Sequence, residues 1–410
     1  MYTLFKSTKK ILLNAVSSRH NSSVSLAIYS VFALLRMGIV ALLVVGFPQL
    51  ESHDGWYFHH GGDQNYYFDF GLVLAEGTYE QYFSVNLGLP AIMAIIIRLF
   101  GSSTFTDLLP HIVLLHGFLF GGMSVIVIGK LTARLLHSED SGYIAAFMWA
   151  IMPWLIWLLI WPHPQASWMR MPYVPGVAWL QGVPDGPAVF FALISIYFLV
   201  QCIESYDIKW VILSAIATGI MLMFRVHFVT IILLSLLVIG MHRRWWDLLL
   251  FPTVAASVYI PQVLYNRLAS LNIGTPGYNP WLPGYLYFGA IDVMAETAYY
   301  YDNSVFNMVS VDHFINTIQL LLTSNFILLF GIVCMFVFYV WGFYRTGQLL
   351  GWVRSIILFG APPAAIGVLS FSSILVDNAY RFTLPSIPFF VVLVSWGITV
   401  VARRSGRHIT

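Results

Sequence analysis

The sequence predicts an all-α polytopic membrane protein, because of its composition and the length of its apolar runs. Of its 410 residues, 59% are hydrophobic and only 9% are charged, and the mean hydropathy is +0.79. Soluble domains carry about 25% charged residues, so a water-soluble protein is excluded. The apolar runs extend along the whole chain, which is typical of a single transmembrane domain over residues 1–410 with about ten to twelve helices.

The first predicted membrane span covers residues 24–47 and follows a basic segment. Its apolar run is too long for a signal-peptide core and lacks a small-residue cleavage pattern, so we expect this helix to be retained. A bilayer-spanning helix needs about 20 apolar residues. On this basis the further predicted spans are residues 108–136, 142–160, 187–203, 248–264, 314–341, 353–374 and 383–402.

Two parts of the chain contain apolar helices that are each too short to cross a bilayer. Residues 211–239 are interrupted midway at Arg225, and two helices of about 14 residues cannot each cross a core of about 30 Å at 1.5 Å per residue. We expect them to form a pair that enters and leaves on one side, with Arg225 near the tip. Residues 87–100 are predicted to form a short helix that dips in from the outer face.

Basic residues give the predicted orientation, because cytoplasmic loops collect Lys and Arg. In this arrangement the basic N-terminal segment, Lys209 and the C-terminal arginines lie on one side, and most of the 18 acidic residues lie on the other. Both termini are therefore expected in the cytoplasm, with any chemistry on the extracytoplasmic face. The bacterial inner membrane is favoured as the location over the endoplasmic reticulum.

Polar residues gather in the first predicted extracytoplasmic loop, residues 48–86. Within it, Asp63, Tyr66, Tyr67, Phe70 and Leu74 recur at helical spacing. This pattern predicts an amphipathic helix in the membrane interface, with its aromatic side towards lipid and Asp63 at its start. The helix dipole favours a carboxylate there, so we expect Asp63 to be ionised. A simple helix cap is the alternative interpretation.

The second and third predicted extracytoplasmic loops are residues 161–185 and 265–312. The second is rich in proline and tryptophan, which is typical of an ordered interfacial loop, and it ends at Asp185 at the head of the next span. Taken alone, Asp185 is equally consistent with a helix cap. The third loop includes Asn266 and is too long for a simple connector, so a substrate-binding or lid role is expected.

Arg225 is the basic residue that most strongly suggests a function. An arginine within the membrane is costly and usually faces a cavity or a charged partner. A guanidinium group can bind phosphate oxygens in a bidentate manner, so a phosphate-bearing lipid is one natural ligand. An internal ion pair, or snorkelling to the surface, is the alternative. The same alternatives, a bound ligand or else an internal ion pair or snorkelling, apply to Arg36 in the first span and to Arg381 beside Tyr380.

Imidazole and carboxylate side chains cluster in the first loop, and such groups can hold zinc or manganese. They are His53, Asp54, His59, His60 and Asp63. The spacing of a His-Glu-x-x-His site is absent, so hydrogen bonding in a polar loop is favoured and a divalent metal stays an open alternative. The 20 basic and 18 acidic residues nearly cancel, so nothing indicates a nucleic-acid partner.

Several short motifs follow one another in an order that resembles a known superfamily. They are Asp63-Gln64-Asn65-Tyr66-Tyr67, Leu74-Ala75-Glu76-Gly77, Leu89-Pro90, Leu99-Phe100-Gly101, Pro184-Asp185, the break at Arg225, Pro261 with Asn266, and Tyr380-Arg381-Phe382 with Leu384-Pro385. Together they resemble the GT-C integral-membrane glycosyltransferases. The sequence is most similar to the branch that holds the protein O-mannosyltransferases and the lipid A aminoarabinose transferase. The likeness covers residues 38–271 and returns at 377–397.

The resemblance implies a GT-C type bundle that transfers a sugar from a polyprenyl-phosphate donor to a glycan, lipid or protein hydroxyl. Separately, we expect that no cofactor is required. The resemblance also implies that Asp63 is the catalytic aspartate, that Asp185, a second outer aspartate, is also a catalytic residue, and that Arg225 is a donor-phosphate contact. The further candidate substrate-binding residues are Tyr67, His59, His60, Asp54, Asn266 and Arg381. The family commonly has a second acidic residue at the position of Gln64. A role that needs a carboxylate there therefore cannot be assigned to this chain from the resemblance.

Elementary chemistry is consistent with this hypothesis. An ionised Asp63 within about 3 Å of an acceptor hydroxyl would take its proton, and Arg225 would stabilise the charge on the departing lipid phosphate. One base and one displacement predict inversion at the anomeric carbon. The alternative from another class is a transporter or flippase of a lipid-linked sugar. Transporters often have matching broken helices in two halves, whereas this chain has one clear interruption. A non-catalytic scaffold is a third and less favoured interpretation.

Overall fold

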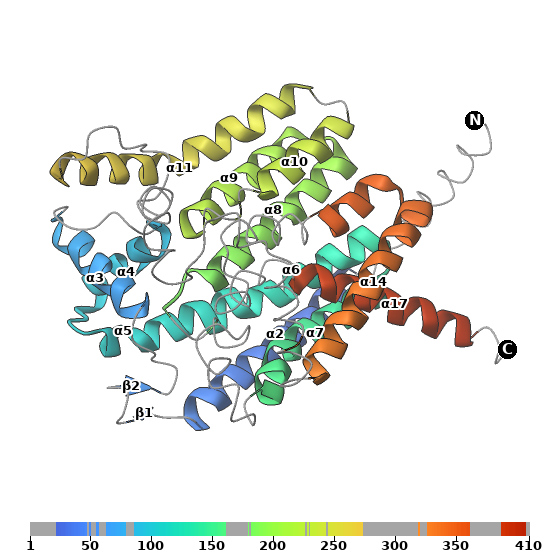
Figure 1. Ribbon diagram of the computed structural model, residues 1–410, viewed down its shortest axis with the longest axis horizontal. Helices are drawn as coiled ribbons and strands as arrows, with labels where there is room; N and C mark the ends of the chain where they lie inside the picture. Colours follow the sequence, from blue (N-terminus) through green and yellow to red (C-terminus); the bar gives the residue numbers. More distant parts are fainter. Residues whose placement is uncertain are drawn as a thin grey trace.

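The computed structural model describes residues 22–46, 49–50, 55–56, 63–78, 86–160, 179, 182–225, 228, 230–242, 245–273, 319, 326–360 and 387–406. Nearly all of these residues are helical (Figure 1). The helices are α2 (Ser22–Gly46), α3 (Asp63–Glu76), α4 (Gly88–Phe100), α5 (Phe105–Ile112), the π-helix η3 (Val113–Phe120), α6 (Gly121–Leu136), α7 (Glu139–Ile160), α8 (Asp185–Ser205), α9 (Ile208–Phe224), α10 (Thr230–Met241), α11 (Trp245–Ile273), α14 (Phe326–Leu350) and α17 (Ile387–Gly406). Two short strands, β1 (Gln49–Leu50) and β2 (Gly55–Trp56), pair in antiparallel fashion.

Within the described residues, four helical stretches are long and apolar enough to cross a membrane. They are Ser23–Val44, Phe105–Leu136, Asp185–Ser205 and Trp245–Leu268. Large apolar side chains are exposed on these and other helices; Leu42 of α2 is 74% exposed and Leu233 of α10 is 66% exposed. Exposed apolar helix faces of this kind suit contact with lipid. The predicted all-α polytopic architecture is confirmed.

The element boundaries agree with the sequence in some places and differ in others. The interruption at Arg225 is present, because α9 ends at Phe224 and α10 begins at Thr230. The predicted start of the third loop at residue 265 is wrong, because α11 continues to Ile273. Tyr265 and Asn266 lie in this continuation of the helix and are buried against protein. The helix therefore extends beyond the end of its apolar run. Figure 1 shows α11 changing direction along its length, and its internal Pro252 and Pro261 each remove a helix hydrogen bond.

Small residues and hydroxyl groups hold the helices of the bundle together, as is common in membranes. Between α8 and α9, the Ser195 hydroxyl lies 2.6 Å from the Thr218 hydroxyl and 3.2 Å from that of Ser214. Between α9 and α11, a Cβ built on Gly219 would lie 2.6 Å from Val258 Cβ and 2.7 Å from the carbonyl oxygen of Ala255. The backbone of α9 therefore packs directly onto α11.

This close packing predicts that Gly219→Ala destabilises the protein. The added methyl group would meet a backbone oxygen that cannot move alone, and overpacking of this kind costs about 1–3 kcal/mol. Gly38→Ala is the matched control, because Gly38 of α2 has nothing within 4 Å and alanine is the better helix former. Thermal unfolding in detergent should give a lower midpoint for Gly219→Ala only. Equal midpoints for the two variants would contradict the packing described.

Arg36 lies inside the protein and does not snorkel. Its side chain is fully buried, and Nη1 donates a hydrogen bond to the backbone oxygen of Trp149 at 2.8 Å. Its guanidinium carbon lies 4.7 Å from the ring centre of Trp179, 5.3 Å from that of Trp149 and 5.9 Å from that of Trp154. Three indole faces and one carbonyl therefore surround this charge, and such cation–π contacts are stronger when desolvated.

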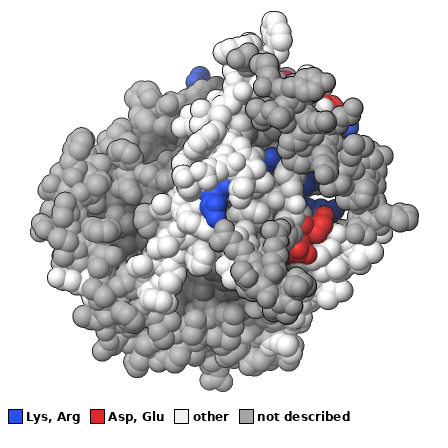
Figure 2. All heavy atoms as spheres, turned by 90° about the vertical axis from the view of Figure 1, so that its right-hand side faces the viewer, with Lys and Arg blue, Asp and Glu red and all other residues white. Residues whose placement is uncertain are grey.

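The two ends of α8 carry different groups of charges. Asp185 begins the helix and Glu204 lies near its end, so the 21 residues of α8 separate them by about 30 Å at 1.5 Å per residue. At the second end, the Glu204 carboxylate pairs with Arg134 at 2.9 Å and with Arg354 at 3.9 Å. Figure 2 shows the right-hand face of Figure 1, where acidic and basic side chains lie beside one another among uncharged residues of the described part of the chain.

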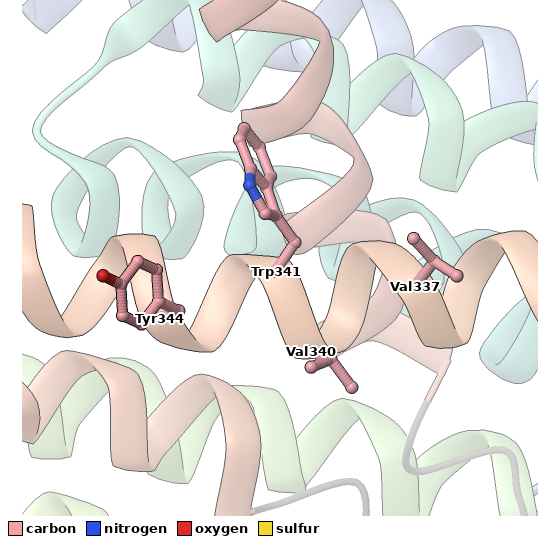
Figure 3. Close-up of a pocket in the computed structure, with 4 residues that line it drawn as sticks. All are labelled: Val337, Val340, Trp341 and Tyr344. Atoms are coloured by element: carbon pink, nitrogen blue, oxygen red, sulfur yellow. The ribbon is translucent and has the colours of Figure 1, made fainter.

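The outer surface of α14 carries a shallow hollow of about 560 Å³. Val337, Val340, Trp341 and Tyr344 line it, and Figure 3 shows these side chains pointing in several directions from the one helix. Its lining offers almost no polar surface for a substrate. We interpret it as part of the lipid-facing surface, separate from the candidate site described next.

Candidate active site

The candidate site begins at α3, which starts at Asp63 as predicted. The side chain of Asp63 lies outside what the structure describes, but the side chains of Tyr67 and Phe70 are buried. A Cβ built on Gly71 would lie 2.8 Å from Met93 Cβ of α4, so the two helices pack closely. For Tyr67 and Phe70, the predicted contact with lipid is therefore wrong. Helical periodicity identifies a buried face but does not show whether protein or lipid covers it.

Hydrogen bonds hold α3 near both of its ends. Near its start, Gln64 is 1% exposed and its Oε1 accepts the backbone N–H of Gly182 at 2.8 Å. At its end, Arg98 Nε of α4 donates to the carbonyl oxygen of Ala75 at 2.7 Å. Gly77 then leaves the helix with a φ of +78°, a conformation that glycine adopts without strain. The position of α3 is thus set by elements distant in sequence.

Asp185 and Arg225 form a buried, bidentate ion pair beside this region. Arg225 Nε donates to Asp185 Oδ1 at 3.1 Å, and Nη2 donates to Oδ2 at 3.0 Å. The two side chains are 3% and 8% exposed, respectively. Asp185 is the first residue of α8, and Arg225 follows the last residue of α9, where its N–H still bonds to the Met221 oxygen. The pair therefore fastens the start of α8 to the end of α9.

This geometry refines the expectations for both residues. Arg225 was expected to bind a lipid phosphate, with an internal ion pair as the alternative, and the ion pair is present. Both carboxylate oxygens of Asp185 are engaged by Arg225, so an incoming phosphate would share the guanidinium group with Asp185. Nothing in the sequence indicates that Asp185 and Arg225 are partners.

A cluster of buried amide groups lies next to the end of α9. Gln262 of α11 accepts the backbone N–H of Leu87 and donates to Asn266 Oδ1 at 2.9 Å. Asn86 Nδ2 lies 3.5 Å from the carbonyl oxygen of Leu222 of α9. Asn266, predicted to lie in an open loop, is instead fully buried in α11. Gln262 and Asn86 were missed, although a glutamine within an apolar span was a signal that could have identified Gln262.

The remaining predicted site residues are not placed. His59, His60, Asp54 and Arg381 lie outside the described residues, as does His53. Among the residues that the structure does describe, no group of three or more His, Cys, Asp or Glu side chains could hold a metal ion. The site that can be built from this chain consists of the start of α3, Gly182, the Asp185–Arg225 pair and the amide cluster.

Solved structures share this architecture, although the sequence matches no family profile and no curated protein. The apo crystal structure of the Archaeoglobus fulgidus oligosaccharyltransferase has a TM-score of 0.57 at 14% identity, covering 96% of this chain and 53% of that chain. This chain has a GT-C type fold. AglB from the same organism, in complex with an inhibitory peptide and a dolichol-phosphate, gives a TM-score of 0.56 at 12% identity over 96% of this chain and 52% of that one.

A third structure of that oligosaccharyltransferase, a complex with Zn and sulfate, gives a TM-score of 0.53 at 12% identity, covering 90% of this chain and 49% of that chain. The present chain thus spans about half the length of the protein that it matches. At such low identity the likeness concerns the fold. The predicted GT-C type fold is confirmed, whereas membership of the superfamily and of a branch within it stays a prediction.

Proposed function

We propose that this multi-pass membrane protein is an inverting glycosyltransferase that moves a sugar from a polyprenyl-phosphate donor to an acceptor hydroxyl. The observation that carries the proposal is the contact between Gln64 and Gly182, which links the helix beginning at Asp63 to the residues just before the Asp185–Arg225 pair. The GT-C type fold supports it, and the similar AglB structure contains dolichol-phosphate, a lipid of the same chemical class as the proposed donor.

In the proposed reaction, Asp63 acts as the general base. The Asp63 carboxylate takes the proton of the acceptor hydroxyl as the oxygen forms a bond to the anomeric carbon. The bond between that carbon and the phosphate oxygen breaks, and the lipid phosphate leaves with the bonding electrons. A carboxylate at a helix N-terminus is favoured by the helix dipole, which keeps it deprotonated before the reaction.

Arg225 is proposed to contact the donor phosphate from a position that Asp185 holds fixed. A preplaced guanidinium stabilises the charge that develops on the leaving group without having to reorganise during the reaction. In this proposal Asp185 orients Arg225 and does not take a proton, which changes the role that the sequence suggested for it. The bidentate geometry of the pair supports this division of roles.

The orientation and the acceptor are also proposals. We place the site on the extracytoplasmic face with both termini in the cytoplasm, because the basic residues Arg134 of α6 and Arg354 lie beside the Glu204 end of α8. The bacterial inner membrane stays the favoured location. A glycan, a lipid or a protein supplies the hydroxyl. A divalent metal stays an open alternative to a metal-free reaction; one structure of the similar oligosaccharyltransferase is a zinc complex.

Transfer in detergent solution tests the proposed function. The purified chain is expected to convert a polyprenyl-phosphate sugar and a hydroxyl acceptor into a glycoside whose anomeric configuration, read by NMR, is opposite to that of the donor. A second carboxylate close enough to act as a nucleophile would be needed for retention. A product with retained configuration would contradict the single displacement. A transporter or flippase would form no product and would act only between two compartments.

A further inference from the structure

Gln64 has no role in the proposed reaction, yet its side chain is buried. It follows Asp63 in the first turn of α3 and is 1% exposed. Its Oε1 accepts the N–H of Gly182 at 2.8 Å, across 118 positions of sequence. A buried amide group costs free energy unless it is hydrogen-bonded, so this contact accounts for a polar side chain at that place.

The segment that contains Gly182 is itself packed tightly against the bundle. We call Trp179 and residues 182–184 the pre-α8 segment. Trp179 is 1% exposed, and its ring centre lies 4.7 Å from the guanidinium carbon of Arg36 and 6.3 Å from the ring centre of Trp149. A Cβ built on Gly182 would lie 2.9 Å from Met93 Cε, so the backbone there is packed against α4. The pre-α8 segment is therefore a fixed reference within the bundle.

The same segment leads directly into the ion pair. Asp185 follows Pro184 and binds Arg225 through both of its carboxylate oxygens. One end of a short, packed segment thus holds the first turn of α3, and the other end is continuous with the residue that holds Arg225. The Gly182 N–H is donated to a side chain of that first turn, so this hydrogen bond ties the start of α3 directly to the pre-α8 segment.

We propose that Gln64 is a positioning residue whose hydrogen bond to Gly182 fixes the first turn of α3, and with it Asp63, relative to the Asp185–Arg225 pair. This inference rests on the proposed function, in which Asp63 is the base. A displacement of about 1 Å in a catalytic group can lower the rate by about 100-fold. The loss is expected in kcat, because Gln64 itself contributes nothing to donor binding.

Two substitutions separate the hydrogen bond from the bulk of the side chain. Gln64→Met keeps a long unbranched side chain and removes the acceptor, whereas Gln64→Glu keeps an oxygen that can accept the Gly182 N–H. Gln201→Met is the matched control, because Gln201 of α8 is also a buried glutamine, at 7% exposure, and lies outside the proposed site. All three variants are purified as full chains in detergent with the wild type.

Steady-state transfer is the first measurement. For Gln64→Met, kcat is expected to fall at least about tenfold while the donor KM changes less than about threefold. Gln64→Glu is expected to recover most of the lost kcat, and Gln201→Met to keep the wild-type value. Hydrogen exchange is the second measurement: the Gly182 amide, which loses its acceptor, and the amides of α3 beyond its first turn should exchange faster in Gln64→Met than in Gln201→Met or the wild type.

The outcomes distinguish this inference from the proposed function. If the wild-type protein transfers no sugar, the proposed function is wrong. The hydrogen-exchange rates alone then show whether Gln64 holds α3 in place. If the wild type transfers sugar and Gln64→Met keeps its kcat, the positioning role is overturned. It is also overturned if α3 exchanges equally fast in Gln64→Met and in the wild type.

Discussion

Asp63→Asn is expected to lower kcat by at least about 100-fold, because a general base contributes about 10²–10⁴ to a rate. Asparagine has nearly the same shape and also accepts hydrogen bonds at a helix N-terminus, so α3 should still begin at residue 63. Donor binding and the thermal unfolding midpoint should change little. Single-turnover transfer with a radiolabelled donor measures the chemical step, and binding of the labelled donor is measured separately.

Asp69→Asn is the matched control for this experiment. Asp69 lies in the same helix and is exposed, and partial desolvation raises the pKa of its carboxyl group. Perturbed pKa values are common at functional sites, so Asp69 is another carboxylate of α3 that needs to be tested. Asp69→Asn should keep full turnover. Equal losses in the two variants, or normal turnover of Asp63→Asn, would remove the assignment of Asp63.

The second large effect is expected at the buried ion pair. Arg225→Met leaves the Asp185 carboxylate without its partner at 3.0 Å, and breaking a buried pair in this way costs about 3–5 kcal/mol of stability. Asp185→Leu should cost a similar amount for the same reason. The double variant Asp185→Leu/Arg225→Met should recover most of the stability, because no unpaired charge remains, but it should not recover transfer. Unfolding in detergent gives the coupling energy of the double-mutant cycle.

An exposed pair provides the comparison. Lys209 lies 2.7 Å from Asp207, with side chains 61% and 38% exposed, and such surface pairs contribute about 0–1 kcal/mol. Lys209→Met should therefore be nearly neutral. If the double variant Asp185→Leu/Arg225→Met is as unstable as the single variants, the lost stability comes from the packing of the new side chains and not from an unpaired charge. If Arg225→Met still transfers sugar at the wild-type rate, the proposed phosphate contact is incorrect.

The local features of the fold could be predicted from the sequence. The helix that begins at Asp63, the short helix over residues 88–100 and the break after Phe224 all follow from apolar periodicity, helix length and a polar interruption. Each of these signals lies within one segment of chain. Local chemistry was therefore sufficient to locate them.

The contacts that build the site could not be predicted in this way. Asp185 and Arg225 are 40 positions apart, and Gln64 and Gly182 are 118 apart. Each residue has a reasonable local explanation, such as a helix cap or a polar loop residue. Only the packing of α3, α8 and α9 shows that they contact one another. For the same reason, the prediction places Tyr67 and Phe70 of α3 against lipid, although protein covers them.

The setting of Arg36 has a consequence for how the chain is made. An arginine at the centre of a lone helix opposes membrane insertion by about 2.5–3.5 kcal/mol. The carbonyl group of Trp149 that accepts its hydrogen bond comes 113 positions later in the chain. During synthesis α2 therefore reaches the bilayer well before the indole rings that will enclose its charge. We expect α2 to stay beside the insertion machinery until α7 has emerged, so that a helix that enters the bilayer before α7 settles only after it.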